Sequence, residues 1–412
     1  MKIWILQTGE PLHIDSGGLR PMRAMNLSNA LIEKGHEVVL WSSDFDHFTK
    51  KHRTGKSSTF EISKNLKIKL IHSRGYSRHI GFARLFDHAQ LAFNLARQIR
   101  RQSLPDIAFI GYPPIEPAWV LTKYLHTKKI PILVDVKDAW PDIFVEPLNK
   151  KYQKFALSLL WPYVAMMKSV LKKSSGINSV TEDFLAWSTS KINRQVKPTD
   201  HVTFLTAPDN EIEEKVKVQA TTWWNTYGLK DSDTPIFSFV GTINNVYDFS
   251  QIIYAAKNSK FKFVIAGDGP NRELILKESV NLPNLILPGW INEAQSTVLA
   301  ENSAAVIIPT RNREDFGMNI TNKFFDAMKF GLPIITSAPG IAEKLLNENR
   351  IGMTFKIEDE SSLLKTILKI IETPNLISEF SENSKNLYEK KFSHKKNYDN
   401  LVEHLEYLYE NF

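Results

Sequence analysis

The stretch NKFFDAMKFGLPIITS, residues 322–337, has the residue types of an anion-binding helix start. It follows an apolar run, AAVIIPT, and a polar loop, and either Thr321 or Asn322 can cap the helix. The free N–H groups of a first helical turn attract anions, and the helix dipole adds to this attraction. Lys323 in that turn costs roughly a few tenths of a kcal/mol unless an anion is near. A bound diphosphate would turn this free-energy cost of Lys323 into a gain, so the pattern predicts a phosphate site.

Two further charged residues fit a nucleotide at the same place. Arg311 ends the preceding strand and could be a second cationic contact. Asp326 lies one turn into the helix, on the face of Lys323, where a carboxylate can accept both hydroxyls of a ribose. The alternative interpretation is a surface helix whose lysine and aspartate have no role in binding.

A glycine-rich loop follows the first expected strand. In EPLHIDSGGLRP, Gly17 and Gly18 would let the backbone approach a phosphate or a sugar closely, or they form a flexible turn. Arg20 and Arg23 could face a lipid diphosphate or lie at the surface.

A third group of charges ends another buried strand, in VDVKDAWPD. Buried charges are costly unless they are paired, so we expect Asp135, Lys137 and Asp138 to be paired with each other or with a ligand. Asp138 is the candidate for acceptor activation or sugar contact, with Lys137 beside it. The alternative is an internal ion pair between Lys137 and an aspartate, with no chemical role.

The elements that must position these residues repeat a strand–helix–strand order. The expected strands are KIWILQ, HEVVLWSS, LKIKLIH, DIAFIGY and PILVDV in the first half, and PIFSFVGT, FKFVIAG, LILPGW, AAVIIPT and LPIITS in the second. This order predicts parallel strands with right-handed crossovers, an α/β fold. A chain of 412 residues is longer than a single hydrophobic core usually supports. We therefore expect two doubly wound, Rossmann-like domains facing each other across a cleft.

The pattern pauses around residues 201–215, which divides the chain into domains at 1–202 and 203–392. Residues 393–412 read as an amphipathic helix with Leu401, Leu405 and Leu408 at helical spacing, which has to pack back on the rest of the chain.

Composition narrows the functional classes. The absence of cysteine excludes disulfides, zinc-thiolate sites and thiol catalysis. A net charge of +7 does not require nucleic acid, and no nucleic-acid-binding motif is present. The Asp-x-Asp pairs at 44–46 and 231–233 are common in loops, and the 11 histidines lack zinc-protease spacing, so no metal is expected. AGDGPNRE lacks the third glycine of a dinucleotide fingerprint.

The stretch 322–337 resembles the donor-site signature of family 4 retaining glycosyltransferases, which have the GT-B fold. In that family the corresponding helix start binds the nucleotide-sugar. The resemblance extends, in the same order, to SGGLRPMRAMNLSNALIEKGHEVVLWSS, VDVKDAWPD, FVGTINNVYDF and VIAGDGPNREL, and so covers nearly the whole chain. VDVKDAWPD is similar to a segment of the subgroup that makes bacterial O-antigen and capsule sugars, including aminosugar transferases.

The resemblance assigns roles to residues of the donor side. Asp326 takes the place of the second glutamate of a Glu-x7-Glu pair, which holds the ribose. The first glutamate would fall at Met318, so the sugar contacts are expected from backbone N–H groups or from nearby carboxylates. The backbone groups are those of Asn319, Ile320 and Thr321, and the carboxylates are those of Glu314 and Asp315.

The phosphate contacts also depart from the family pattern. Many members have an arginine after the glycine that corresponds to Gly241, and a lysine a few residues later, whereas this chain has Thr242 and no lysine nearby. Arg311 and Lys323 are the expected substitutes. Lys137 stands where many relatives have a histidine that contacts the donor sugar, and where the subgroup has arginine.

The resemblance implies a retaining glycosyltransferase of surface-polysaccharide synthesis. The donor would be a UDP-sugar, or with less support a GDP-sugar, and the acceptor a polyprenyl-diphosphate-linked or other glycan. No cofactor is implied, because the nucleotide-sugar is a substrate and a clamped diphosphate needs no metal. The N-terminal domain would bind the acceptor, with the last helix packed back on it, and the C-terminal domain the donor.

Two other classes stay open. A UDP-aminosugar epimerase of the same fold would share the ribose carboxylate, and a non-catalytic sugar-nucleotide-binding partner would fit the missing glutamate. We expect a cytoplasmic protein, either free or at the inner face of the cytoplasmic membrane. The basic, aromatic helix expected within 75–102 could lie on an anionic membrane, or it could bury its apolar face in the core.

Overall fold

The computed structural model describes residues 1–16, 20–77, 81–146, 148–229, 234–312 and 314–412. The chain divides into two compact units: Met1–Pro208 together with His394–Phe412, and Asp209–Ser393. The division lies a few residues after the predicted 202/203 boundary. The reason is a pair of hydrogen bonds that tie the intervening segment to the C-terminal helix: Phe204 N–H donates to Asn397 Oδ1 (3.0 Å), and Asn397 Nδ2 donates to Phe204 O (2.9 Å).

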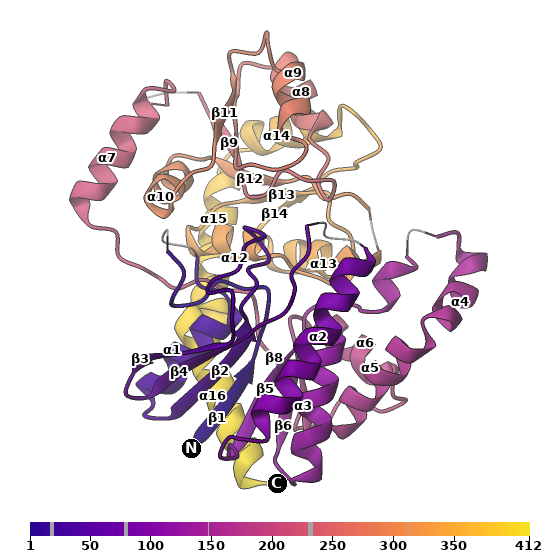
Figure 1. Cartoon of the computed structure of the whole chain (residues 1–412). Coiled ribbons are helices and arrows are strands. Elements are labelled where there is room, and N and C mark those ends of the chain that lie inside the picture. Colours follow the sequence, from indigo (N-terminus) through magenta and orange to yellow (C-terminus); the bar gives the residue numbers. More distant parts are fainter. Residues whose placement is uncertain (17–19, 78–80, 147, 230–233, 313) are drawn as a thin grey trace. The chain divides into compact units, whose positions relative to one another are not determined.

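The first unit is an α/β layer structure (Figure 1). Its elements are β1 (Lys2–Leu6), α1 (Arg23–Glu33), β2 (Glu37–Ser43), β3 (Ser58–Ser63), β4 (Leu66–Ile71), α2 (Phe82–Ile99), β5 (Ile107–Tyr112), α3 (Ile115–Thr127), β6 (Ile132–Val136), η1 (Asp142–Phe144), α4 (Lys150–Leu159), α5 (Trp161–Lys173), β7 (Gly176–Ser179), α6 (Glu182–Ser190), β8 (His201–Val202) and α16 (His394–Glu410).

The sheet of this unit has the order β3-β4-β2-β1-β5-β6-β7-β8, and all its pairs are parallel except β3 with β4. Alternate residues of each strand enter two separate cores. Ile3 and Ile5 of β1 pack with α1 and α16, while Trp4 and Leu6 pack with α2, α3 and α5. Because both faces are covered, the central strands are mostly apolar, as parallel strands in α/β proteins are, and the buried Asp135 of β6 is paired with Arg23.

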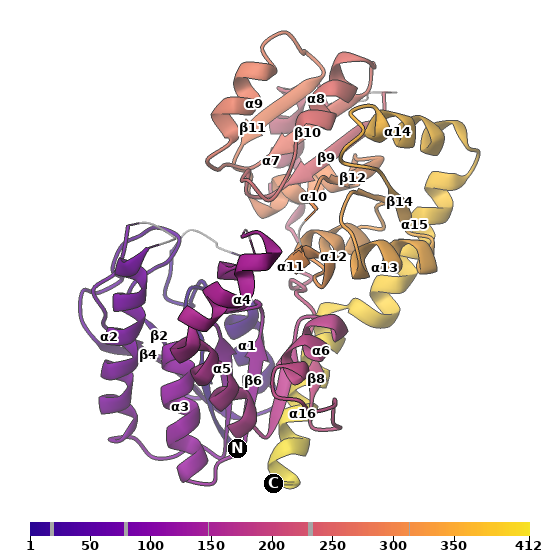
Figure 2. The same ribbon diagram turned by 90° about the vertical axis from the view of Figure 1, so that its right-hand side faces the viewer.

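The second unit repeats this architecture (Figure 2). Its elements are α7 (Glu214–Asn225), β9 (Ile236–Val240), α8 (Ser250–Lys257), β10 (Lys262–Ala266), α9 (Arg272–Glu278), β11 (Leu285–Gly289), α10 (Glu293–Glu301), β12 (Ala305–Ile308), α11 (Glu314–Gly317), α12 (Asn322–Lys329), β13 (Ile334–Thr336), α13 (Ile341–Asn349), β14 (Gly352–Thr354), α14 (Ser362–Glu372), α15 (Leu376–Leu387) and the π-helix η2 (Tyr388–Phe392).

The sheet of the second unit is parallel, in the order β11-β10-β9-β12-β13-β14. Helix α8 contacts α14, and α7 contacts α10 over a core that includes Trp224 and Val298. The order extends outward from β9 in one direction and from β12 in the other, which is the doubly wound arrangement that the sequence predicts.

The C-terminal helix returns to the first unit. In Figure 1 the yellow α16 lies beside the indigo strands, and Leu401, Leu405 and Leu408 are buried with Ile3 and Leu27 in one core. The predicted amphipathic helix and its packing on the N-terminal domain are confirmed. Among the described residues, none of the helices combines the length and the apolar character that spanning a membrane requires.

Candidate functional site

The strand order of the second unit fixes where a ligand can bind. Strands β9 and β12 are neighbours, and the chain leaves their carboxyl ends in opposite directions, which is where doubly wound sheets bind ligands. The loops after these two strands are joined to each other. Tyr247 forms an isolated antiparallel bridge with Thr310, and Arg311 N–H donates to Val246 O at 2.9 Å. The two loops therefore form one layer over the strand ends.

Helix α12 begins at Asn322, as predicted, beside this layer. Thr321 occupies the N-cap with φ −70° and ψ 158°, but its side chain makes no capping hydrogen bond. Thr321 Oγ1 and Asn319 Oδ1 are buried and have no hydrogen-bond partner among the described residues. Asn319 N–H already donates to Phe316 O at 3.3 Å, and Ile320 is 3% exposed. Buried polar atoms without partners are rare, and here they gather at a helix start that can accept a ligand.

The side chain of Lys323 folds over the end of β9. Its Nζ lies 5.0 Å from the centroid of the Phe239 ring and 5.3 Å from that of the Tyr247 ring, within the range of a cation–π contact. Gly241 directly follows β9 with φ +142°, and a Cβ on this residue would overlap the Nζ of Lys323. The structure thus brings two predicted donor-site residues, Gly241 and Lys323, together.

Other predicted donor-site residues line the same end of the sheet. Arg311 Nη1 lies 2.9 Å from Asp248 Oδ2, and its side chain is 50% exposed, so the guanidinium is held in place and still open to solvent. Thr242 is exposed and Asp326 is half-buried, one turn into α12. Burial raises the pKa of Tyr247 to about 12, so this phenol stays neutral beside the lysine.

Two glycines after β10 allow a close backbone approach at this site. Gly267 and Gly269 have φ +140° and +153°. A Cβ on Gly267 would overlap the carbonyl oxygen of Gly241, and one on Gly269 would overlap the backbone of Ile243. The turn in VIAGDGPNREL therefore packs backbone to backbone against the segment that follows β9.

Some predicted residues cannot be placed in the site. Gly17 and Gly18 lie outside the described residues, as do residues 231–233, which include one of the discounted Asp-x-Asp pairs. Glu314 and Asp315 are in α11, but their side chains are also outside the described part of the structure.

The charges after β6 in the first unit are paired differently from the prediction. Lys137 forms a close ion pair with Glu10, which follows β1, and not with a neighbouring aspartate. The other carboxylate oxygen of Glu10 accepts a hydrogen bond from Ala24 N–H at the start of α1 (2.9 Å). The ends of β1 and β6 and the start of α1 are therefore linked by one carboxylate, while Asp138 is exposed.

Arg23 is a core residue and not a surface or lipid-diphosphate contact, which corrects both interpretations of the sequence. It is 2% exposed, its Nε lies 3.3 Å from Asp135 Oδ2, and its Nη2 donates to Thr203 O at 2.6 Å. Burial opposes its charge, but the nearby Asp135, Tyr398 and Glu10 outweigh burial and raise the pKa of Arg23. Arg20, in contrast, is exposed.

Sequence reasoning missed three residues of these two groups: Glu10, Tyr247 and Asp248. Their partners lie far away in the sequence: 127 residues separate Glu10 from Lys137. The available signal was position, because each of the three closely follows a predicted strand, where side chains of different strands meet.

Comparisons with known proteins agree with this geometry. Residues 226–387 match the family model described as "Glycosyl transferases group 1". No curated protein sequence matches the chain at a significant level. The matched stretch includes the end of β9, the end of β12 and the start of α12, which together make up the candidate site.

Solved structures share the fold over the whole chain. Sucrose-phosphate synthase from Thermosynechococcus elongatus is 13% identical, with a TM-score of 0.72 over 100% of both chains. HepE from Anabaena in complex with UDP is 10% identical, with a TM-score of 0.64 over 98% of this chain and 99% of that chain. WaaG, a glycosyltransferase involved in lipopolysaccharide biosynthesis, is 13% identical, with a TM-score of 0.63 over 98% and 99%.

These similarities confirm the predicted fold class but do not distinguish the predicted subgroup. Residues 226–387 are similar to group 1 glycosyltransferases, and the chain has the GT-B fold of its structural neighbours.

Proposed function

We propose that this protein is a retaining glycosyltransferase that moves a sugar from a nucleotide-sugar, with UDP-sugars favoured, to a glycan or lipid-linked acceptor. The observation that carries the proposal is a group of residues at the start of α12, which we call the seat. A lysine, a half-exposed arginine and buried polar atoms without partners among the described residues gather at the switch point of a parallel sheet. A diphosphate fits this set because it supplies both negative charge and acceptor oxygens.

The proposed reaction uses this seat to stabilise the leaving group. As the bond between the sugar carbon and the diphosphate breaks, negative charge grows on the phosphate oxygen, where Lys323, Arg311 and the α12 N–H groups offset it. The acceptor hydroxyl attacks the same face of the sugar, and its proton passes to the leaving phosphate. Asp326 would accept the ribose hydroxyls. We assign no carboxylate as a covalent nucleophile.

The acceptor would bind in the first unit, near the paired charges at the ends of β1 and β6. Lys137 is held by Glu10 and is 16% exposed, so it can point one charge at a sugar or a phosphate without a large movement. Asp138 is exposed beside it and remains the candidate for acceptor contact. Gly17, Gly18 and Arg20 are the remaining proposed acceptor-side residues.

The proposed donor and the proposed pathway are argued from the similar solved structures. The HepE structure contains UDP, which favours a UDP-sugar, and WaaG acts in lipopolysaccharide synthesis, which favours surface-polysaccharide assembly with a polyprenyl-diphosphate-linked acceptor. We infer a cytoplasmic protein at the inner face of the cytoplasmic membrane, where such acceptors are held. The exposed aromatic residues of α2 and α4 support this location.

Two other functions would use the same fold. An epimerase would convert a UDP-aminosugar without any acceptor, so incubation of the protein with the nucleotide-sugar alone separates it from a transferase. A non-catalytic binding partner would hold the nucleotide and transfer nothing. Met318 stands in place of the family's first glutamate. This replacement favours the non-catalytic binding partner over the epimerase, because it removes a contact to the sugar and leaves the contacts to the nucleotide unchanged.

Lys323→Gln tests the seat. Loss of a charged donor to the diphosphate should lower turnover by roughly 100-fold and weaken UDP binding by roughly tenfold. The matched control is Lys257→Gln, an exposed lysine in the last turn of α8. Calorimetric titration with UDP and transfer assays with a panel of UDP-sugars measure both effects. Unchanged binding and unchanged turnover in Lys323→Gln would remove the seat from the mechanism.

A further inference from the structure

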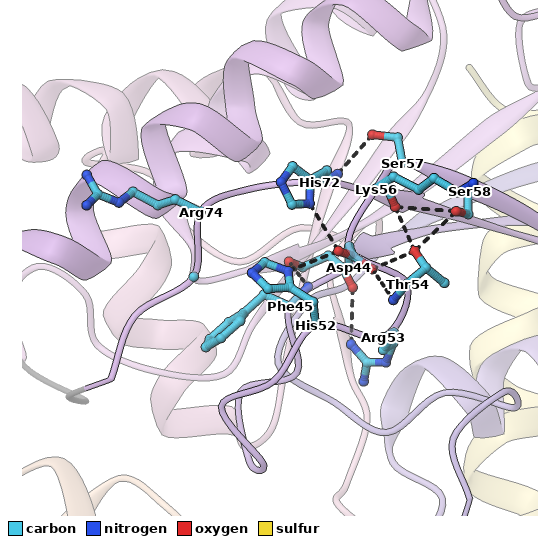
Figure 3. A network of polar contacts seen from close by, with 12 residues as sticks. Asp44, Phe45, His52, Arg53, Thr54, Lys56, Ser57, Ser58, His72 and Arg74 are labelled. Atoms are coloured by element: carbon cyan, nitrogen blue, oxygen red, sulfur yellow. Dashed lines mark hydrogen bonds and ion pairs between the residues drawn. The ribbon is translucent and has the colours of Figure 1, made fainter.

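Two histidines and an aspartate meet at the carboxyl ends of β2 and β4, away from the residues proposed for transfer. Asp44 follows β2 and His72 follows β4, and the two strands are parallel neighbours with Ser43 opposite Ile71. His52 comes from the loop between β2 and β3. Figure 3 shows both imidazole rings turned toward the carboxylate of Asp44.

The spacing of the three ligand atoms fits a metal ion. His52 Nδ1 lies 3.0 Å and His72 Nδ1 lies 3.1 Å from Asp44 Oδ2, and all three atoms lie within 4.8 Å of one another. Ligands about 2.0–2.1 Å from a tetrahedral Zn²⁺ stand about 3.4 Å apart, so the two measured sides need to lengthen by only about 0.3 Å. The third side, between the two histidines, is at most 4.8 Å and has to settle at the same value, and each residue offers one ligand atom.

The second oxygen of the aspartate is already held. Asp44 Oδ1 accepts hydrogen bonds from the N–H and the Oγ1 of Thr54, both at 2.8 Å, and the Asp44 side chain is fully buried. These bonds fix the carboxylate plane and leave Oδ2 to face the histidines (Figure 3). An outer partner that orients a ligating carboxylate in this way is a regular part of metal sites.

The loop that carries His52 is also fixed at several points. Asp46 N–H donates to Lys51 O and Arg53 N–H donates to Asp44 O, both at 2.8 Å. The Arg53 guanidinium makes two 2.7 Å contacts with the carboxylate of Asp15. The position of His52 is therefore set by the fold of the loop, independently of any ion.

We propose that Asp44, His52 and His72 bind one divalent transition-metal ion, with Zn²⁺ as the expected occupant and water as a further ligand. Imidazole nitrogen together with carboxylate oxygen suits Zn²⁺, whereas Mg²⁺ and Ca²⁺ select sites made of oxygen ligands. The side chains of His52 and His72 are 30% and 36% exposed, so the water ligand comes from the solvent side.

Binding exchanges one set of bonds for another. A histidine that binds the ion through Nδ1 carries its proton on Nε2, so the two hydrogen bonds to Asp44 break. Two nitrogen–metal bonds and one oxygen–metal bond form, and they replace three metal–water bonds of the hydrated ion, whose waters return to the solvent. No oxidation or reduction is involved. The ion would tie the loop 45–57 to the ends of β2 and β4, which is a structural role separate from the proposed sugar transfer.

The test uses the untagged full-length protein, stripped with a chelator, dialysed and titrated with Zn²⁺ alone by calorimetry. We expect one equivalent to bind, and X-ray absorption to show two imidazoles in the shell. Asp44→Asn, His52→Gln and His72→Gln should each weaken binding at least 100-fold, and Thr54→Val about tenfold. His126→Gln, an exposed histidine of α3, is the control that keeps wild-type affinity.

A second measurement guards against variants that fail to fold. Hydrogen exchange of residues 45–57 should slow when Zn²⁺ is added to the wild type and should not change in the His52→Gln/His72→Gln double variant. Circular dichroism confirms that the variant is folded. The absence of saturable Zn²⁺ binding by the wild type, or equal binding by the folded double variant, would overturn the proposal. Neither result depends on transfer activity.

Discussion

The charge of Lys323 is best understood with its neighbours. A lysine in the first turn of a helix is disfavoured by the dipole, but here two aromatic faces and a glycine surround it. Cation–π contacts offset about 0.5–1 kcal/mol and hold the ammonium at the end of β9, so it needs little rearrangement when a diphosphate binds. The residue is therefore pre-positioned for an anion.

Gly241→Ala tests this pre-positioning. The new Cβ would displace the Nζ of Lys323, and the backbone at φ +142° would be strained by roughly 1–3 kcal/mol. UDP affinity should fall about tenfold, together with a lower Tm. Gly228→Ala is the control, because Gly228 also has a positive φ (+70°) but nothing within 4 Å of the added Cβ. Its Tm should fall without any change in UDP affinity. Equal affinities in both variants would contradict the arrangement.

Single residues differ in how far the sequence predicts them. The site at Lys323 could be predicted because its cap, its helix and its lysine follow one another in the sequence. The partner of Lys137 is not local, and neither is the grouping of His52 and His72 around Asp44, which linear histidine spacing misses. Such contacts depend on which strand ends are neighbours, and this follows only from the sheet order.

At the scale of elements, strands rich in apolar residues were predictable, and strands with few apolar residues were not, whether exposed like β3 or buried like β7 (Gly176–Ser179). β1, β2, β5 and β6 are rich in apolar residues because helices cover both faces. β3 was not predicted. It pairs antiparallel with β4 at the edge of the sheet, and most of its side chains are exposed, so no apolar pattern marks it. The sequence therefore gives the core of each sheet better than its edges.

The contact between β8 and α16, which we call the joint, should contribute less to stability at acidic pH. The ring of His201 lies edge-on to that of His404, with 4.7 Å between centroids. Burial, then the charge of His404 and then that of Arg23 lower the pKa of His201 to about 3. Its unfolded pKa is about 6.5, so the unfolded chain binds more protons between these values. The stability that neutral His201 contributes is therefore present above pH 6.5 and is lost as the pH falls.

The expected loss is up to about 2 kcal/mol between pH 7 and pH 5, at a slope of about 1.4 kcal/mol per pH unit. Urea unfolding of the wild type at several pH values measures it. His201→Gln cannot take up the proton, so its stability should change less with pH, although His404, whose pKa burial also lowers, keeps part of the effect. His126→Gln should follow the wild type. Parallel curves for the wild type and His201→Gln would exclude this joint as the acid-sensitive element.

At the scale of the whole molecule, the chain crosses from one unit to the other twice. Residues 209–393 form a unit with its own sheet and core, and α16 then completes the first unit. The termini therefore belong to one unit, and the stretch that matches the group 1 glycosyltransferase model belongs to the other. In the proposed function, a surface of the first unit would contact the acceptor or a membrane, and the proposed donor site belongs to the other unit.

Such a surface is visible on two helices of the first unit. Phe82, Phe86 and Phe93 of α2 are 79%, 62% and 61% exposed, on the face opposite the buried His88 and Leu95. In α4, which has no buried residue, Tyr152, Phe155 and Leu159 are 53%, 66% and 66% exposed and share one face. The core accounts for one side of α2, which confirms the core interpretation, and contact of the exposed aromatic side with a membrane stays a prediction.

We expect the protein to sediment with vesicles that contain anionic lipid, and less so at high salt, because exposed Lys151 and Lys154 lie to one side of the aromatic face of α4. Replacing Phe155 and Leu159 by serine should lower vesicle binding on the order of tenfold, because two apolar side chains no longer enter the lipid interface. Leu274→Ser/Val280→Ser removes equally exposed apolar groups from the second unit and should leave binding unchanged. If both double variants bind like the wild type, the aromatic face of α4 does not contact lipid. If only the second double variant loses binding, the membrane contact belongs to the donor-binding unit and the acceptor would have to reach it there.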